Sequence, residues 1–66
     1  MKYRVKFGHY GHYSEELTKK QAIQQAKDFI MAGEEYVFIT WFRKKDGQQG
    51  YLNPDGNHAI TGRAWD

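Results

Sequence analysis

The chain has 66 residues, a formal net charge of +2 and no cysteine. This length fits one domain covering residues 1–66, near the lower limit at which a chain folds by packing alone. The lack of cysteine excludes disulfides and thiolate metal sites as sources of stability. We therefore expect the aromatic side chains, 17% of the residues, or self-association as a homodimer to stabilise the fold.

No apolar run approaches the roughly 18 residues that indicate a membrane-spanning helix. The first residues, 1–7, alternate apolar and basic side chains, unlike the charged start and apolar block of a signal peptide. The sequence therefore predicts a cytoplasmic protein without a membrane partner.

Residues 2–7 alternate strictly, which predicts a half-buried strand. The apolar side chains on one side of it are Tyr3, Val5 and Phe7. The basic side chains on the other side are Lys2, Arg4 and Lys6. Two copies of Gly-His-Tyr follow at residues 8–13, and their glycines indicate a loop or a bulged extension of the strand.

A helix is predicted to begin near Thr18, because Thr18 and Gln21 have the spacing of a capping box. Residues 14–16, Ser-Glu-Glu, are an alternative start. Gly33 predicts a left-handed C-terminal cap. The apolar residues at helical spacing, which should face the sheet, are Ala22, Ile23, Ala26, Phe29 and Ile30.

Residues 35–44 are rich in β-branched and aromatic side chains and predict the longest strand. Asp46-Gly47 predicts a two-residue hairpin turn, and residues 48–52 the returning strand. Asn53-Pro54-Asp55-Gly56 predicts a second turn before a short strand at 57–61. The predicted fold is α+β, in the order β-α-β-β-β, with one helix on one face of a mainly antiparallel four-stranded sheet. Whether the first strand lies parallel beside the long strand or at the far edge is left open.

One helix covers one face of such a sheet, so the other face is open. We expect Val37, Ile39 and Trp41 to face the helix, although the pattern alone also permits the reverse. The open face would then combine rings with cations. The residues predicted to bind a partner there are Lys2, Arg4, Lys6, Tyr36, Phe38, Phe42 and Arg43.

Such a face suits either an acidic protein surface held by aromatic anchors or nucleic-acid bases stacked on rings beside paired phosphates. A third reading is that the C-terminal tail, the Gly-His-Tyr loop or a second copy of the chain covers it, because large exposed apolar patches are rare in monomers.

Residues for catalysis are not apparent. Ser14 has no base or oxyanion site set by spacing, and the glycines do not form a phosphate-binding motif. His9, His12 and His58 have no spacing that fixes a metal site. The sequence therefore predicts a non-enzymatic protein with no cofactor and no metal.

The segments Tyr51-Leu52-Asn53-Pro54-Asp55-Gly56 and Gly62-Arg63-Ala64-Trp65 resemble the ends of small accessory proteins from bacteriophages and prophages. This resemblance covers about a quarter of the chain and transfers no site residue. It implies a protein that binds a host protein or a protein–nucleic-acid complex, as anti-CRISPR and other anti-defence inhibitors do, or that binds nucleic acid directly.

Overall fold

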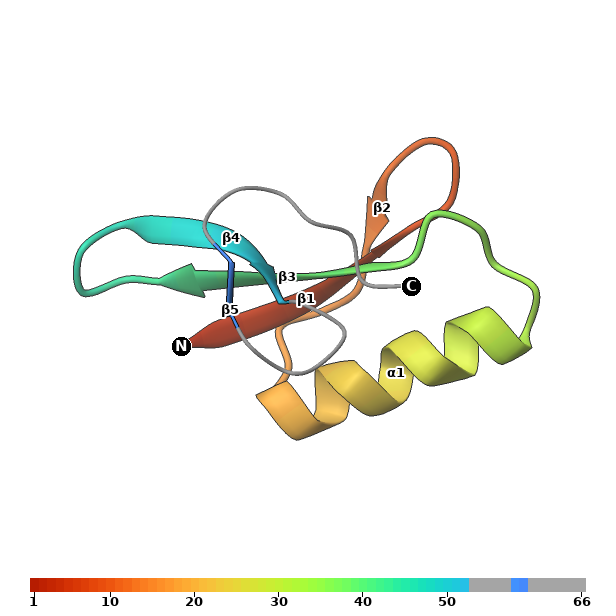
Figure 1. Ribbon diagram of the computed structural model, residues 1–66, viewed down its shortest axis with the longest axis horizontal. Coiled ribbons are helices and arrows are strands. Elements are labelled where there is room, and N and C mark those ends of the chain that lie inside the picture. The colour runs from red at the N-terminus through yellow and green to blue at the C-terminus, as the bar shows by residue number, and fades with distance from the viewer. Residues whose placement is uncertain (53–57, 60–66) are drawn as a thin grey trace.

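The computed structural model describes residues 1–52, 58 and 59. Within them the chain forms one helix and five strands. Their order is β1 (Lys2–Phe7), β2 (His12–Tyr13), α1 (Lys19–Met31), β3 (Phe38–Arg43), β4 (Gln48–Leu52) and β5 (His58–Ala59). Figure 1 shows the helix as a separate layer beside the sheet, which confirms the predicted α+β arrangement.

The sheet has the order β2-β1-β3-β4-β5, and every neighbouring pair is antiparallel. The short strand β2 is an addition to the four strands that the sequence predicts. It belongs to a segment that runs back along β1, because Ser14 N–H donates to the Val5 carbonyl and Leu17 exchanges two backbone hydrogen bonds with Tyr3.

This returning segment explains the direction of β3. It brings the chain back to the start of β1, where α1 begins. The chain that leaves α1 then reaches the C-terminal end of β1, where Gly8 N–H donates to the Glu35 carbonyl at 2.8 Å. The chain then enters β3 antiparallel to β1, and no parallel crossover is needed. Ser14 is part of the sheet edge, with its Oγ accepting from Val5 N–H, so the alternative helix start at 14–16 is wrong.

Both ends of α1 have the predicted caps. Gln21 N–H donates to Thr18 Oγ1 at 3.2 Å, while Thr18 N–H donates to Gln21 Oε1 at 3.1 Å, which completes the capping box. At the other end, Gly33 N–H donates to the Ile30 carbonyl and Glu34 N–H to the Phe29 carbonyl. These two bonds form a Schellman motif, for which Gly33 supplies the left-handed residue at a φ of 88°.

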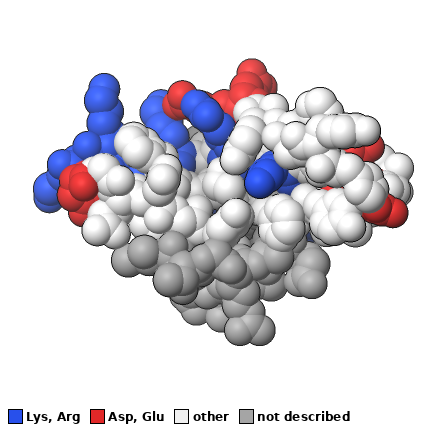
Figure 2. Space-filling view, turned by 90° about the horizontal axis from the view of Figure 1, so that it is seen from above, with Lys and Arg blue, Asp and Glu red and all other residues white. Residues whose placement is uncertain are grey.

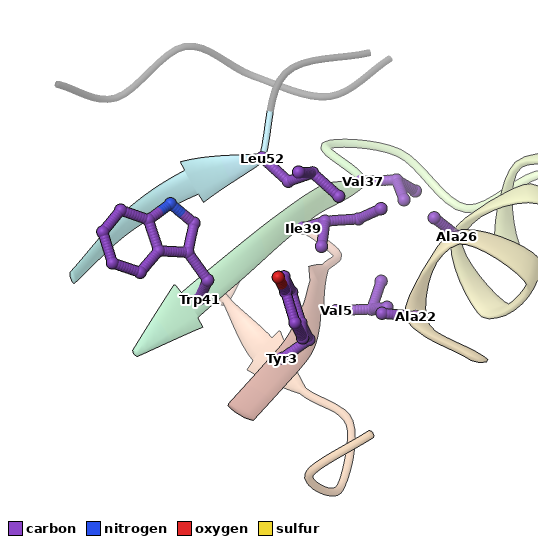
Figure 3. Packing of buried hydrophobic residues seen from close by; sticks show 8 residues of the cluster. All are labelled: Tyr3, Val5, Ala22, Ala26, Val37, Ile39, Trp41 and Leu52. Atoms are coloured by element: carbon purple, nitrogen blue, oxygen red, sulfur yellow. The ribbon is translucent and has the colours of Figure 1, made fainter. Parts of the chain in front are cut away.

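The core lies between α1 and one face of the sheet (Figure 3). Alternate residues of β1 and β3 point into it, as predicted. Its buried members are Tyr3, Val5, Ala22, Ala26, Val37, Ile39, Trp41 and Leu52. Because the helix contributes alanines, its backbone can approach the strands closely. The prediction for Ile30 is wrong: this side chain is exposed, and Phe29 instead packs on Phe7 with ring centroids 4.2 Å apart.

The start of β3 and the length of the β3–β4 loop differ from the prediction. Strand β3 begins at Phe38 and not at residue 35, because Tyr36 has a φ of 56°, which an extended strand does not allow. The β3–β4 loop has four residues, 44–47, since Arg43 pairs with Gln48. Only Gly47 of these has a positive φ, so the two-residue turn predicted at Asp46-Gly47 is wrong.

Two predictions lie outside the described residues: the turn at 53–56 and, apart from Tyr51 and Leu52, the segments 51–56 and 62–65 that carry the resemblance. Of the strand predicted at 57–61, the structure describes β5. In the part of the chain that is described, no helix has the length and apolar character needed to cross a membrane.

We expect Gly33→Ala to lower the free energy of unfolding by about 1 kcal/mol, measured by urea denaturation. The reason is conformational. A Cβ at this position meets no atom within 4 Å, but the alanine backbone must adopt a φ of 88°, which is unfavourable for a residue with a side chain. Gly33→Asn is the control, since asparagine tolerates this region and should lose less. An alanine variant as stable as the original chain would contradict the role of the cap.

Candidate binding face

The face of the sheet opposite α1 carries a regular array of side chains, which we call the open face. Strand β1 contributes Lys2, Arg4 and Lys6, and β3 contributes Phe38, Thr40 and Phe42. The flanking strands add Tyr13, Gln49 and Tyr51. The register places these side chains in cross-strand rows, with Lys6 between Tyr13 and Phe38, Arg4 beside Thr40, and Lys2 beside Phe42.

A hollow of about 840 Å³ lies on the open face. Its lining includes Thr40, Phe42 and Tyr51 of the open face, together with Glu16 and Lys44 from outside the face. Its volume falls within the range of about 300–1,000 Å³ that is typical of ligand pockets. The open face is therefore concave enough to hold part of another molecule.

The rings of the open face differ in how accessible they are. Phe42 is 43% exposed, whereas Phe38 and Tyr51 are half-buried and pack edge to face, with centroids 5.8 Å apart. Tyr13 at the sheet edge is 53% exposed. Phe42 is thus the ring of the open face on β3 that offers the most surface to a partner, whereas Phe38 and Tyr51 pack against one another nearer the start of β3.

The cations of the open face already have contacts within the chain. Arg4 Nη2 lies 3.4 Å from Glu16 Oε1, and Lys2 Nζ lies 4.0 Å from Glu16 Oε2. Lys6 Nζ lies 5.9 Å from the centre of the Tyr13 ring. All these side chains are at least partly exposed, so each contact contributes about 1 kcal/mol or less.

Two of the predicted binding residues lie elsewhere. Tyr36 is in the α1–β3 connection, where its ring contacts His9 edge to face at 4.8 Å and where His9 Nε2 pairs with Glu35 at 2.7 Å. Arg43 lies 5.8 Å from the Trp41 ring, so it extends from the opposite face of β3. The structure brings together the remaining predicted residues: Lys2, Arg4, Lys6, Phe38 and Phe42.

Sequence reasoning missed several residues of this region, among them Tyr13, Glu16 and Tyr51. Tyr51 could have been found, because a hairpin loop of two or of four residues places it on the same face as Phe42. Tyr13 and Glu16 had no comparable signal, since their positions depend on the return of residues 12–17 along β1.

Charge is unevenly distributed over the described part of the face that Figure 2 shows. Figure 2 shows lysine and arginine side chains gathered toward the end of the molecule that carries the β3–β4 hairpin in Figure 1, with acidic side chains among them. At the hairpin, Arg43 Nη2 pairs with Asp46 Oδ2 at 2.8 Å. The hydrogen bond from Arg43 holds the pKa of Asp46 below its usual range, with help from the bond that Gln48 N–H donates.

No group of three side chains able to hold a metal ion is found among the described residues. Comparisons with protein-family models, with curated proteins and with solved structures find no match for the chain.

The Asp46 contacts predict a pH dependence of stability. The folded-state pKa of Asp46 is lowered, so its contribution is present above the unfolded-state pKa of about 3.9 and is lost as pH falls through the folded value. We expect the chain to be more stable than Asp46→Asn in urea at pH 6, with the difference closing below about pH 4.

Asparagine keeps an oxygen that accepts from Gln48 N–H, so this comparison isolates the charge. A difference that persists unchanged at pH 2 would show that the Asp46 carboxylate does not act through its ionised form.

Proposed function

We propose that this protein is a non-enzymatic binding or inhibitor protein of phage or mobile-element type. It acts by occupying a macromolecular partner, a host protein or a protein–nucleic-acid complex, through the open face. The observation that carries the proposal is the hollow in which the exposed Phe42 ring lies beside Lys2 and Arg4. A ring next to cations combines an apolar anchor with charge complementarity.

A protein partner fits the described contacts better than a nucleic acid. Glu16 offsets part of the charge of Lys2 and Arg4, and the formal net charge of the whole chain is only +2. Phe38 and Tyr51 pack against one another edge to face, which occupies surface that stacked bases would need. The partner surface proposed here is acidic, with an apolar side chain for the hollow.

Single-stranded nucleic acid is the second candidate, favoured by the arrangement in rows. The cations of β1 are spaced about 6.8 Å apart along the strand, and the adjacent strand β3 carries Phe42 opposite Lys2 and Phe38 opposite Lys6. This arrangement places phosphate contacts alongside stacking contacts, as in surfaces that bind single strands.

Phe42→Ser should reduce capture of a protein partner from nuclease-treated bacterial lysate by at least about tenfold, as expected for loss of an aromatic anchor. The matched control is Tyr10→Ser, which removes a ring that is 91% exposed on the β1–β2 loop. Circular dichroism should show both variants folded, because Phe42 is 43% exposed. Equal capture by the two variants would contradict the proposed anchor.

The nucleic-acid candidate is tested by fluorescence titration with single- and double-stranded oligonucleotides at 50 and 200 mM salt. Direct phosphate contacts predict an affinity that falls steeply with salt. They also predict a larger loss for the triple variant Lys2→Gln, Arg4→Gln, Lys6→Gln than for Lys19→Gln, Lys20→Gln, Lys27→Gln. The second variant removes the same charge from exposed positions on α1. No binding at the lower salt would exclude this candidate.

A further inference from the structure

Glu16 lies at the margin of the open face in the connection between β2 and α1. The backbone on both sides of it is held to β1. Leu17 N–H donates to the Tyr3 carbonyl at 2.7 Å, and Ser14 N–H donates to the Val5 carbonyl at 2.8 Å. The carboxylate of Glu16 reaches back over β1, where it contacts Arg4 and Lys2. The side chain can therefore change rotamer while its backbone stays fixed.

Both contacts of Glu16 are long for ion pairs. Charge-assisted hydrogen bonds between nitrogen and oxygen usually measure about 2.7–2.9 Å, whereas these distances are 3.4 and 4.0 Å. The side chain of Glu16 is 47% exposed, and those of Arg4 and Lys2 are 51% and 70% exposed. Water and salt screen such pairs, so another carboxylate with better geometry can replace Glu16 at small cost.

We infer that Glu16 is an internal competitor that occupies the place of a partner's carboxylate. The inference rests on the proposed function, and it names the partner's chemistry at this point. An acidic side chain of an extended peptide segment pairs with Arg4 and Lys2, and an apolar side chain two positions along the peptide contacts Phe42. Lys2 and Phe42 are direct cross-strand partners, and side chains at positions i and i+2 of an extended peptide point to the same side, so a carboxylate and an apolar group at these positions reach both.

This arrangement has a consequence for the free protein. While Glu16 is in place, the charge of Arg4 and Lys2 is offset, and long-range attraction of unrelated anions is weaker. A partner that carries both the acidic and the apolar group recovers the cost of displacing Glu16 through its contact with Phe42. An anion without an apolar group does not. Glu16 therefore favours the combined acidic and apolar ligand over a simple anion.

The test is a nuclear magnetic resonance titration that follows backbone amides of the open face. The probe is the acetylated and amidated peptide Glu-Ser-Phe-Ser-Glu, whose glutamates and phenylalanine point to the same side when it is extended. It is added to the original chain, to Glu16→Gln and to Glu15→Gln. Both variants lose one negative charge, but Glu15 does not line the hollow. We expect Glu16→Gln to bind about two- to fivefold more tightly than the original chain, the factor that an exposed ion pair is worth, and Glu15→Gln to be unchanged.

Three results would overturn the inference. Binding at the open face that is equal in all three proteins, or tightened equally by both substitutions, would remove the role of Glu16 while leaving the proposed function intact. The lack of any saturable shift at open-face amides, in all three proteins, would remove the proposed acidic-peptide site as well. Tighter binding of a ten-residue thymidine oligonucleotide than of the peptide would assign the open face to nucleic acid.

Discussion

The structure depends on the register between β1 and β3. Val5 lies opposite Ile39, and both side chains are fully buried beneath α1. Because side chains alternate along a strand, this pairing also fixes Lys2, Arg4 and Lys6 opposite Phe42, Thr40 and Phe38 on the other face. A slip of one residue would place cations in the core, which is prohibitively costly. The register that keeps charged side chains out of the core therefore also brings together the side chains of the open face.

The helix determines how much of the sheet is covered. Ala22 and Ala26 are fully buried, so α1 lies close to the strands, while its capping box and Schellman motif fix its length. A chain of this size forms few layers of secondary structure. Among the described helices and strands, only α1 covers the face of the sheet that is opposite the open face. The open face keeps a hollow that is lined by the partly exposed ring of Phe42 and by residues of both charges, Arg4 and Glu16. These features are the ones on which we base the proposed recognition of another molecule.

The features predicted correctly are those that local chemistry determines. The alternation of β1, the capping box at Thr18 and the cap at Gly33 each depend on residues within a few positions. Two of the errors have causes that no periodic pattern reveals. The return of residues 12–17 along β1 depends on hydrogen bonds between these two segments and brings Tyr13 and Glu16 to the open face, and Tyr36 adopts a positive φ where the chain leaves α1 for β3. Arg43 differs, because alternation along β3 already places it on the same side as Trp41.

Phe42 is a surface ring beside the cations of β1 and not part of a second core. Paramagnetic relaxation by a soluble gadolinium chelate measures this exposure, because it broadens the protons that solvent reaches. We expect strong broadening of the Phe42 ring protons and little effect on the methyl groups of Val5 and Ile39. Phe42 ring protons as protected as those methyl groups would show that the ring is buried and would remove the binding face.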